Sequence, residues 1–458
     1  MALGANIRMI DGSLARLGDL MHTAVASIWG VIVASESDIF SEAATPDQAI
    51  PAGNRIITLD LIRGIAVLGI LFANITAFGQ PVAAYFWPPA MPGGASESDK
   101  LTWLIQFVLI DHKMRGLFSL LFGAGMMLFV ERAWAKGSGR WLQFRRLFWL
   151  LIFGSVHFYF IWLGDILQLY AVWGMVALLF MKWRAKTQLL VGLALYGLSS
   201  VAMVGMMGSP YYLTTHPEAA QNFPIEMRQE VAEAETKTLE EVQEALQLHQ
   251  QGSYSDFVRH QLTEEVADNY QNMIFGLIET LPLILIGMAL YRFGFFSGAL
   301  DPLMMRRWGW IGLITGLAGA AVAGWWAYAV GFPFHLTAFA FNGTMMAPRL
   351  AFVLGFAALL VLWAPRFTQS WLGDRLVYAG RMAFSNYLGT SIIMLFVFEG
   401  WALGLYGKFH RVELFGVVLL IWVAMLLWSK PWLRRFRYGP LEWLWRCLTY
   451  MRLFPLRR

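Results

Sequence analysis

Apolar residues in this chain gather into runs much longer than the elements of a typical water-soluble domain. A helix needs about 20 mostly apolar residues to cross the hydrocarbon core of a bilayer. Ten runs approach or exceed that length, and they cover residues 56–79, 115–134, 143–162, 164–182, 187–207, 270–291, 308–330, 347–364, 382–401 and 412–430. The strands of a membrane β-barrel would instead alternate apolar and polar residues over about ten positions. The pattern therefore predicts an all-α, polytopic transmembrane helical bundle of about 10–11 helices.

An eleventh apolar run, 101–110, is too short to span the bilayer comfortably. It predicts a half-helix or a helix at the membrane interface. If only the ten longer runs cross, the N-terminus lies on the same side as the C-terminus. If residues 101–113 also cross, the two termini lie on opposite sides.

Composition supports a membrane protein and excludes several other classes. Hydrophobic residues make up 58% of the 458 residues and charged residues 14%, whereas a soluble domain carries about 25% charged residues. This balance excludes soluble enzymes and disordered chains. The single cysteine, Cys447, excludes an intrachain disulfide and a cysteine-based metal site. The histidines are scattered along the chain, so no metal site is expected.

Charge is distributed unevenly between alternate loops. Lysine and arginine gather after every second span and in the C-terminal tail, which the positive-inside rule places in the cytoplasm. The longest loop on the opposite side, 208–269, has twelve acidic residues against three basic ones. The pattern predicts a multi-pass membrane protein with a cytoplasmic C-terminus.

Five segments follow from these patterns, and they place the membrane helices in two halves. They are an interfacial helix and linker (1–54), an N-terminal membrane bundle (55–207), an acidic extracytoplasmic helical insertion (208–269), a C-terminal membrane bundle (270–430) and a basic amphipathic tail (431–458).

Polar side chains inside apolar spans are costly and are therefore candidates for function. Asp60 and Arg63 are three residues apart in the first span, so they share a helix face and can pair. Asn74 lies about 16 Å further along the same helix. A structural ion pair and an interhelical hydrogen bond are the alternatives to a role in substrate binding or catalysis.

His157 lies near the outer end of the third span, and Asp165 follows a tight turn at the start of the next. The two helices run antiparallel, so the two side chains can approach each other. A carboxylate that orients an imidazole makes a competent general base. The alternative is a histidine bonded to a backbone carbonyl, with Asp165 as a helix N-cap.

Two further clusters are candidate substrate-binding residues. Asp111, His112, Lys113 and Arg115 precede the motif LFSLLFGAG, and the predicted topology places them at the outer face. They form either a solvated loop or a site for an anionic or sugar substrate. Glu279 lies near the midplane of the sixth span, where it must be protonated or paired.

Basic and amide side chains at the inner mouth of the bundle are candidate cofactor-binding residues. Arg381 and Asn386 lie about one turn apart in the sequence GRMAFSNYLGTS, and Arg145 lies at the start of the third span. Guanidinium groups are suited to bidentate contacts with phosphate. Anchoring at the basic face and helix packing are the alternatives.

Five motifs in order resemble the YeiB-like family of bacterial inner-membrane proteins, a domain of unknown function. They are LDLIRGIAVLGILFAN, LFSLLFGAG, GSVHFYFIWLGDILQLYAVWG, GRMAFSNYLGTS and GPLEWLWRCLT, and together they cover residues 55–450.

More distantly, the first span is similar to that of the heparan-α-glucosaminide N-acetyltransferase group of transmembrane acyltransferases. The shared LD-x-x-RG…N pattern is carried by Leu59, Asp60, Arg63, Gly64 and Asn74. The resemblance implies acyl transfer from cytoplasmic acyl-CoA to a sugar amine or hydroxyl across the membrane. That group uses a histidine shortly after the asparagine, and residues 75–100 contain none. His157 or His112 would have to replace it.

The predicted function is acyl transfer from acyl-CoA to a hydroxyl or amine of a glycan or lipid. His157 is the expected base, Asp165 its orienting partner and Asn74 the oxyanion contact. The expected partners are membrane lipids and the acceptor, with no nucleic acid and with a homodimer as a further option. The alternatives are a transporter of a small amphipathic metabolite, with Glu279 as the proton-coupled residue, and a non-catalytic scaffold.

Overall fold

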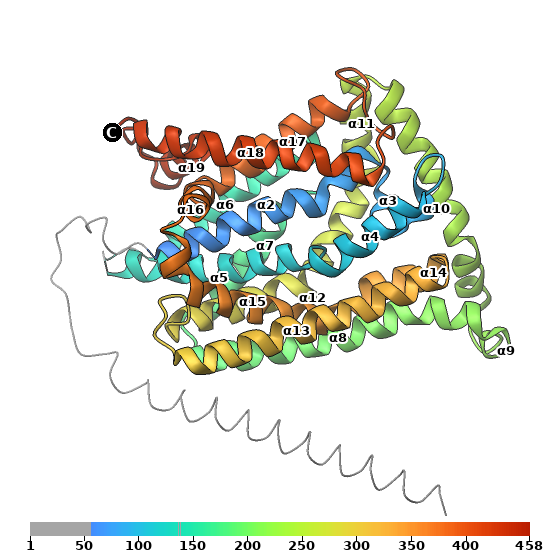
Figure 1. The fold of residues 1–458 in the computed structure, drawn as a ribbon, viewed down its shortest axis with the longest axis horizontal. Coiled ribbons are helices and arrows are strands. Elements are labelled where there is room, and N and C mark those ends of the chain that lie inside the picture. Colours follow the sequence, from blue (N-terminus) through green and yellow to red (C-terminus); the bar gives the residue numbers. More distant parts are fainter. Residues whose placement is uncertain (1–55, 136, 138) are drawn as a thin grey trace, which may run out of the picture. The chain divides into compact units, whose positions relative to one another are not determined.

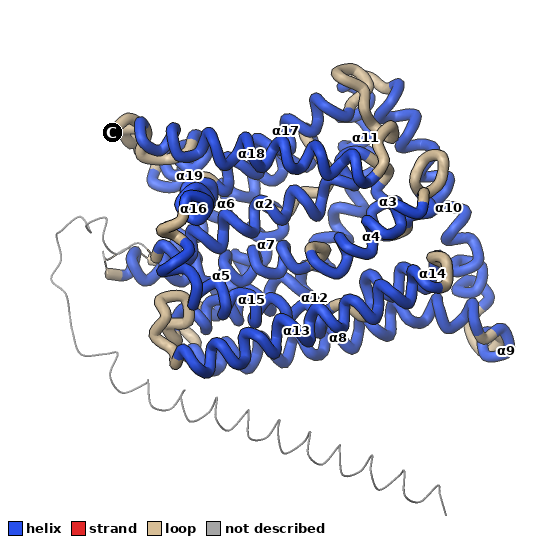
Figure 2. Tube along the Cα trace, viewed as in Figure 1, coloured by secondary structure: helices blue, strands red, loops and turns tan. Residues whose placement is uncertain are grey.

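The computed structural model describes residues 56–458 except 136 and 138, and almost all of them are helical or lie in short connections (Figures 1 and 2). An isolated bridge between Phe436 and Arg457 is the one β-pairing in the described residues. The all-α fold is confirmed. The predicted interfacial helix and linker of residues 1–54 lie outside the described residues.

The helices follow the apolar runs and extend several of them. Their bounds are α2 Ile57–Gly79, α3 Val82–Phe86, η2 Pro88–Ala90, α4 Glu97–Leu109, α5 Lys113–Trp134, α6 Arg140–Phe160, α7 Leu167–Ala177, η3 Leu178–Phe180, α8 Ala185–Thr215, α9 Pro217–Ala220, α10 Ile225–Gln251, α11 Tyr254–Thr263, α12 Glu265–Arg292, α13 Pro302–Ala329, α14 Phe334–Ala338, η4 Phe339–Gly343, α15 Met346–Phe367, α16 Trp371–Arg381, α17 Ala383–Phe398, α18 Arg411–Arg435 and α19 Pro440–Tyr450.

Seven segments of the described chain are long and apolar enough to cross a membrane, and the bent pair α16–α17 makes an eighth. Each predicted run falls in a helix, including the two not among those eight, which are α6 and the shorter α7 continued by η3. The run 101–110 is a half-helix, as predicted. It forms α4, which leads into α5 after a break, and the two together make one candidate span, Glu97–Trp134.

In addition to the bent pair α16–α17, two of the seven long spans are interrupted. Between α4 and α5, His112 adopts a left-handed conformation with φ of 62°. The span Phe334–Phe367 is likewise broken where the π-helix η4 ends and α15 begins. The two breaks adjoin, since the rings of His112 and Phe341 lie 4.5 Å apart. The second break was not predicted from the sequence.

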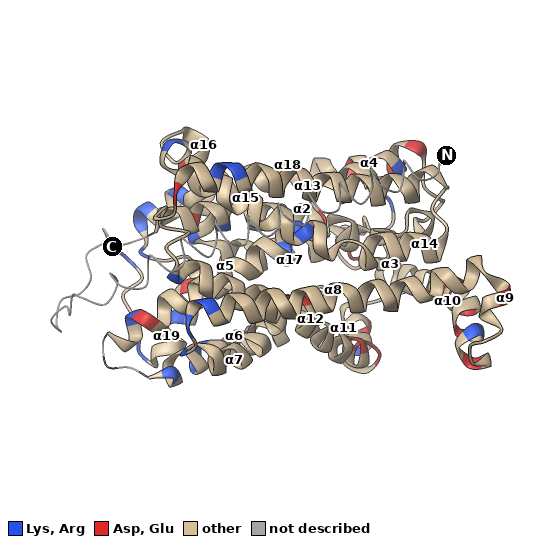
Figure 3. Ribbon diagram, turned by 90° about the horizontal axis from the view of Figure 1, so that it is seen from below, with Lys and Arg blue, Asp and Glu red and all other residues tan. Residues whose placement is uncertain are grey.

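Charge separates the two ends of the bundle formed by residues 56–458. Lysine and arginine gather at the end where α16 and α19 lie, which we call the basic end (Figure 3). The opposite end carries α3, α10 and α11, and we call it the acidic end (Figures 1 and 3). Helices α8 and α12 extend toward the mostly exposed α10 and α11 there.

Glycines let two pairs of helices touch backbone to backbone. A Cβ atom on Gly64 of α2 would lie 2.1 Å from the carbonyl oxygen of Leu376, and one on Gly380 of α16 would lie 1.9 Å from that of Asp60. Likewise, a Cβ on Gly123 of α5 would lie 2.1 Å from the oxygen of Ile284 in α12. Close packing of small residues is a common way to join membrane helices. These contacts place the polar residues of α2 beside those of α16, and those of α5 beside those of α12.

Candidate functional site

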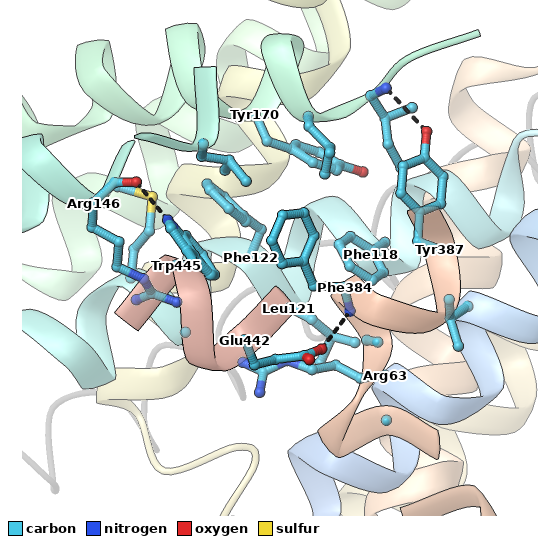
Figure 4. Close-up of a pocket in the computed structure, with 18 of the residues that line it drawn as sticks. Arg63, Phe118, Leu121, Phe122, Arg146, Tyr170, Phe384, Tyr387, Glu442 and Trp445 are labelled. Atoms are coloured by element: carbon cyan, nitrogen blue, oxygen red, sulfur yellow. Dashed lines mark hydrogen bonds between the residues drawn. The ribbon is translucent and has the colours of Figure 1, made fainter. Parts of the chain in front are cut away.

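A cavity of about 190 Å³ opens at the basic end of the bundle (Figure 4). Its wall combines side chains from six parts of the chain, namely α2, α5, α6, the start of α7, the α16–α17 bend and α19. The lining residues used below are Asp60, Arg63, Phe118, Phe122, Gln143, Arg146, Tyr170, Arg381, Phe384, Tyr387, Glu442 and Trp445. We call this space the inner cavity.

Three guanidinium groups line the inner cavity. Arg63 lies 3.6 Å from the carboxylate of Asp60, so the pair predicted from their spacing is formed. Arg146 lies between two rings, 4.3 Å from the centroid of Trp445 and 4.7 Å from that of Phe129. Arg381 lies over the ring of Tyr378. Stacking uses the face of a guanidinium, whereas an anionic ligand binds to its N–H edge.

The C-terminal tail forms part of this cavity. Glu442 of α19 accepts hydrogen bonds from the backbone N–H groups of Phe384 and Ser385 at 2.9 and 3.0 Å, which caps the first turn of α17. Burial raises the pKa of Glu442, and these hydrogen bonds oppose the rise. The indole of Trp445 donates to the carbonyl of Arg146 at 2.8 Å. The tail predicted as a membrane-surface segment is therefore also a wall of the site.

The interior of the cavity is aromatic. Phe118 and Phe122 of α5 each stack on Tyr170 of α7, and Phe384 of α17 also lines the cavity. Tyr387 lies at the far end, where its hydroxyl donates to the carbonyl of Gly164 and accepts from the N–H of Ile166, both at 3.4 Å. The cavity thus joins a cationic wall to an apolar interior, which fits a ligand with an anionic head and an apolar arm.

His157 and Asp165 form the pair that the sequence predicted. His157 Nδ1 lies 2.7 Å from Asp165 Oδ1, and both side chains are fully buried. The other oxygen of Asp165 accepts the N–H of Gln168 at 2.7 Å. Asp165 therefore orients the imidazole and also accepts a hydrogen bond from the first turn of α7, although the N-cap position itself is Ile166. His157 Nε2 has no hydrogen-bond partner.

Tyr387 separates the predicted catalytic residues. Its ring centroid is 5.2 Å from that of His157. Asn74 lines a second cavity of about 10 Å³, to which Tyr387 also contributes. His157 itself does not line the inner cavity. The three predicted residues are thus gathered around Tyr387, which the sequence analysis did not assign a role.

Two of the predicted cofactor-binding residues lie elsewhere. Asn386 donates to the carbonyl of Ala379 and accepts from the indole of Trp428, so it holds the α16–α17 bend against α18. Arg145 does not line the inner cavity, whereas its neighbour Arg146 does. Helical spacing could have found Arg146, because it precedes His157 by eleven residues, about three turns.

The cluster Asp111–Arg115 is not at the outer face of the bundle, and that prediction is wrong. Asp111 and Lys113 are fully buried, and the 13 residues of α4 lie between them and the acidic end. The half-helix of α4 extends the span outward, which moves the cluster inward by about 20 Å. Lys113 donates to the carbonyl of Phe107 at 2.8 Å, and its ammonium lies 5.8 Å from the centroid of the Phe352 ring.

Glu279 is paired, which is one of the two states predicted for it. It contacts Arg115 at 2.5 Å and is also bonded to Arg349 of α15. This triad joins α5, α12 and α15 beside the two helix breaks and lies apart from the inner cavity. Arg349 was missed, although an arginine inside an apolar run is itself a signal. In the described residues no group of three or more His, Cys, Asp or Glu could hold a metal ion.

Comparisons with known proteins give relatives without an assigned activity. Residues 290–452 match the family model described as "Protein of unknown function (DUF418)". The chain is 32% identical over 416 residues to uncharacterized protein YeiB of Escherichia coli K12, which covers 86% of this chain and 96% of YeiB. It is 30% identical over 427 residues to uncharacterized protein YxaH of Bacillus subtilis 168, covering 88% and 96%. No solved structure matches the chain.

Proposed function

The chain belongs to the family of multi-pass membrane proteins that includes YeiB and YxaH, and we propose that it transfers an acyl group from acyl-CoA to a hydroxyl or amine acceptor. The inner cavity is the proposed donor site. Its combination of Arg63, Arg146 and Arg381 with an aromatic interior is the observation that carries the proposal.

The chemistry of acyl-CoA matches this combination. Its phosphates call for guanidinium groups, which bind them through charge-assisted and bidentate hydrogen bonds. Its acyl-bearing arm is far less polar and suits a wall of phenylalanine and tyrosine rings. We place the phosphates among Arg63, Arg146 and Arg381 and the thioester toward Tyr387. The gathering of cations at the basic end supports a cytoplasmic orientation of this mouth under the positive-inside rule.

The proposed reaction uses the buried histidine. With Nδ1 donating to Asp165, the neutral ring of His157 presents Nε2 as an acceptor. The acceptor's hydroxyl or amine proton passes to Nε2 while its oxygen or nitrogen attacks the thioester carbonyl. The C–S bond then breaks, and the departing CoA thiolate takes the proton from His157. Asn74 donates to the oxyanion. Tyr387 lies between these groups, so its side chain must move for the reactants to meet.

The test is ligand binding to purified protein in nanodiscs, followed by thermal unfolding. A ligand that binds the folded state raises the apparent melting temperature by mass action. We expect saturable stabilisation by acetyl-, succinyl- or long-chain acyl-CoA that exceeds the effect of free CoA. Arg146→Ala is expected to remove it, whereas the adjacent Arg145→Ala retains it. Stabilisation by none of these donors, in a protein shown to be folded, contradicts the proposal.

A transporter is the second candidate, and the two broken spans favour it. Discontinuous helices that meet near a buried charge are typical of transporter binding sites. Here the breaks adjoin at His112 and Phe341, beside Glu279. Glu279→Gln is expected to abolish pH-driven flux into proteoliposomes if the chain is a proton-coupled transporter. Retained acyl transfer in that variant would favour the enzyme.

A further inference from the structure

A second histidine–carboxylate pair lies at the acidic end, outside the site described above. His249 of α10 has its Nδ1 atom 2.7 Å from Oε1 of Glu399, which follows the last residue of α17. The two side chains are 13% and 7% exposed. The ring of His249 also stacks on Tyr406 with a centroid distance of 4.4 Å. Contacts between residues 150 positions apart thus hold α10 on the end of α17.

This pair lines a third cavity of about 20 Å³, which we call the outer cavity. The rest of the wall is almost entirely apolar and includes Phe78, Trp162 and Phe257. Glu399 Oε2 is buried and has no hydrogen-bond partner. A buried carboxylate oxygen without a donor is costly. The unsatisfied oxygen at the wall of this cavity indicates that a hydrogen-bond donor from outside the chain completes the site.

The chemistry of the pair specifies that ligand. Since the carboxylate accepts from Nδ1–H of His249, the neutral ring presents Nε2 as a hydrogen-bond acceptor. Glu399 Oε2 is also an acceptor. Glu399 Oε2 therefore lacks a donor. A hydroxyl or an amine supplies that donor and can also donate to Nε2 of His249, whereas an ionised carboxylate or phosphate supplies none. Because the rest of the wall is apolar, we expect the donor group to belong to a molecule with an apolar body.

The outer cavity is aligned with the inner cavity along α2. The inner cavity and the small cavity at Asn74 share Val67, Ile70 and Tyr387, and the small and outer cavities share Phe78. Fifteen residues of α2 separate Arg63 from Phe78, a rise of about 22 Å. The rings of Phe78 and Trp162 stack with centroids 3.9 Å apart, and Phe78 is the lining residue that the small and outer cavities share.

We propose that the outer cavity binds the acceptor through its hydroxyl or amine, with His249 and Glu399 as the binding residues and the Phe78–Trp162 stack as the gate to Asn74. This assignment rests on the proposed acyl transfer for its role, while the ligand class follows from the pair itself. The acceptor is thus an amphiphile that donates a hydrogen bond, and it enters from the acidic end.

The experiment titrates three probes with the same six-carbon body into nanodisc-embedded protein, with empty nanodiscs subtracted. Hexyl β-glucoside carries hydroxyl groups, hexylammonium carries an amine, and hexanoate carries no donor at neutral pH. Ligand-observed NMR reports saturable binding. We expect at least one of the two donor probes to bind and hexanoate not to bind, and the better of glucoside and ammonium identifies hydroxyl or amine as the acceptor group. Glu399→Gln and His249→Gln are each expected to weaken that binding at least tenfold.

The matched control is His260→Gln, because His260 forms another histidine–carboxylate contact, with Glu265, away from the outer cavity. It is expected to bind the probes as the wild type does. Binding that is absent for all probes, or unchanged in both Glu399→Gln and His249→Gln, overturns the inference. Acyl-CoA stabilisation is measured in the same preparations. Acyl-CoA binding without probe binding would defeat this inference alone, and probe binding without acyl-CoA binding would defeat only the proposed function.

Discussion

The two histidine–carboxylate pairs share one contact distance and differ in everything around it. In each, Nδ1 of the histidine lies 2.7 Å from a carboxylate oxygen. His157–Asp165 is closed by a short turn and fully buried, and the second oxygen of Asp165 accepts a hydrogen bond from the first turn of α7. His249–Glu399 joins distant helices at the edge of a cavity, and the second oxygen of Glu399 has no partner.

The histidine–carboxylate contact alone therefore does not define the function of a pair. The inner pair is saturated at the carboxylate, so only His157 Nε2 remains for chemistry. The outer pair retains acceptor capacity on both residues, so it is suited to hold a donor ligand. We therefore assign proton transfer to the inner pair and acceptor binding to the outer pair, and the variants below test that division.

The largest expected effect is in Asp165→Asn. An amide at this position cannot hold the His157 tautomer as the carboxylate does, and general-base catalysis contributes about 10²–10⁴-fold. We expect the rate of acyl transfer at saturating donor to fall at least about 100-fold while stabilisation by acyl-CoA is retained. The rate is measured by release of free CoA thiol. An unchanged rate would show that the inner pair does not supply the general base.

Gly380→Ala tests whether the inner region depends on backbone contact between α2 and α16. Its Cβ would lie 1.9 Å from the carbonyl oxygen of Asp60, so the helices must separate. Overpacking of this kind costs about 1–3 kcal/mol. We expect a lower melting temperature and weaker acyl-CoA binding, with probe binding at the outer cavity retained.

Gly389→Ala is the control for that variant, because a Cβ at Gly389 meets nothing within 4 Å. It is expected to match the wild type in both measurements. Equal losses in the two variants would show that any added methyl group disturbs α16–α17, and the backbone-contact explanation would be discarded.

Arg146→Ala tests whether the inner cavity binds the acyl donor. Loss of a hydrogen bond to a charged group costs about 1.5–3 kcal/mol, which corresponds to at least about a tenfold weaker affinity. We expect that loss for acyl-CoA, measured by titrated thermal shift, with no change in hexyl glucoside binding. Arg145→Ala, whose side chain lies off the cavity wall, is expected to leave both affinities unchanged.

The smallest effect concerns His260–Glu265, a half-buried counterpart of the two pairs. The hydrogen bond to Glu265 raises the pKa of His260 above its usual value. A raised pKa in the folded state stabilises the protein below the unfolded-state value of about 6.5 and loses that contribution as pH rises through the folded value. His260→Gln should therefore lower the melting temperature slightly at pH 6 and leave it unchanged at pH 8. A difference that grows at pH 8 would be inconsistent with this linkage.

Local signals predicted much of the inner region. The spacing of Asp60 and Arg63 predicted their ion pair, and the short turn between α6 and α7 predicted the His157–Asp165 contact. Both depend on a few residues of helix or turn geometry. The inner cavity is lined by Arg146 and not by the predicted Arg145, and helical phase along α6 separates these two neighbours.

Long-range packing determined what the sequence reading missed. Nothing near Glu279 in the sequence predicts Arg349, and nothing near His249 predicts Glu399. The misplacement of the Asp111–Arg115 cluster has a related cause. A half-helix ahead of the cluster can lie along the membrane surface or extend the span, and its packing against α13 and α18 decides for the latter.

Residue spacing was sufficient to predict the apolar helices, the separation of charge between the two ends and the pairs that lie within one turn or one helix. These features follow from residue spacing, because chain geometry brings such positions together in any compact fold. Three further features depend on the tertiary structure. They are the set of guanidiniums that share the inner cavity, the place where the helix breaks meet and the contact between His249 of α10 and Glu399. Those contacts form only when distant helices pack against one another. Short-range sequence patterns do not indicate which helices become neighbours.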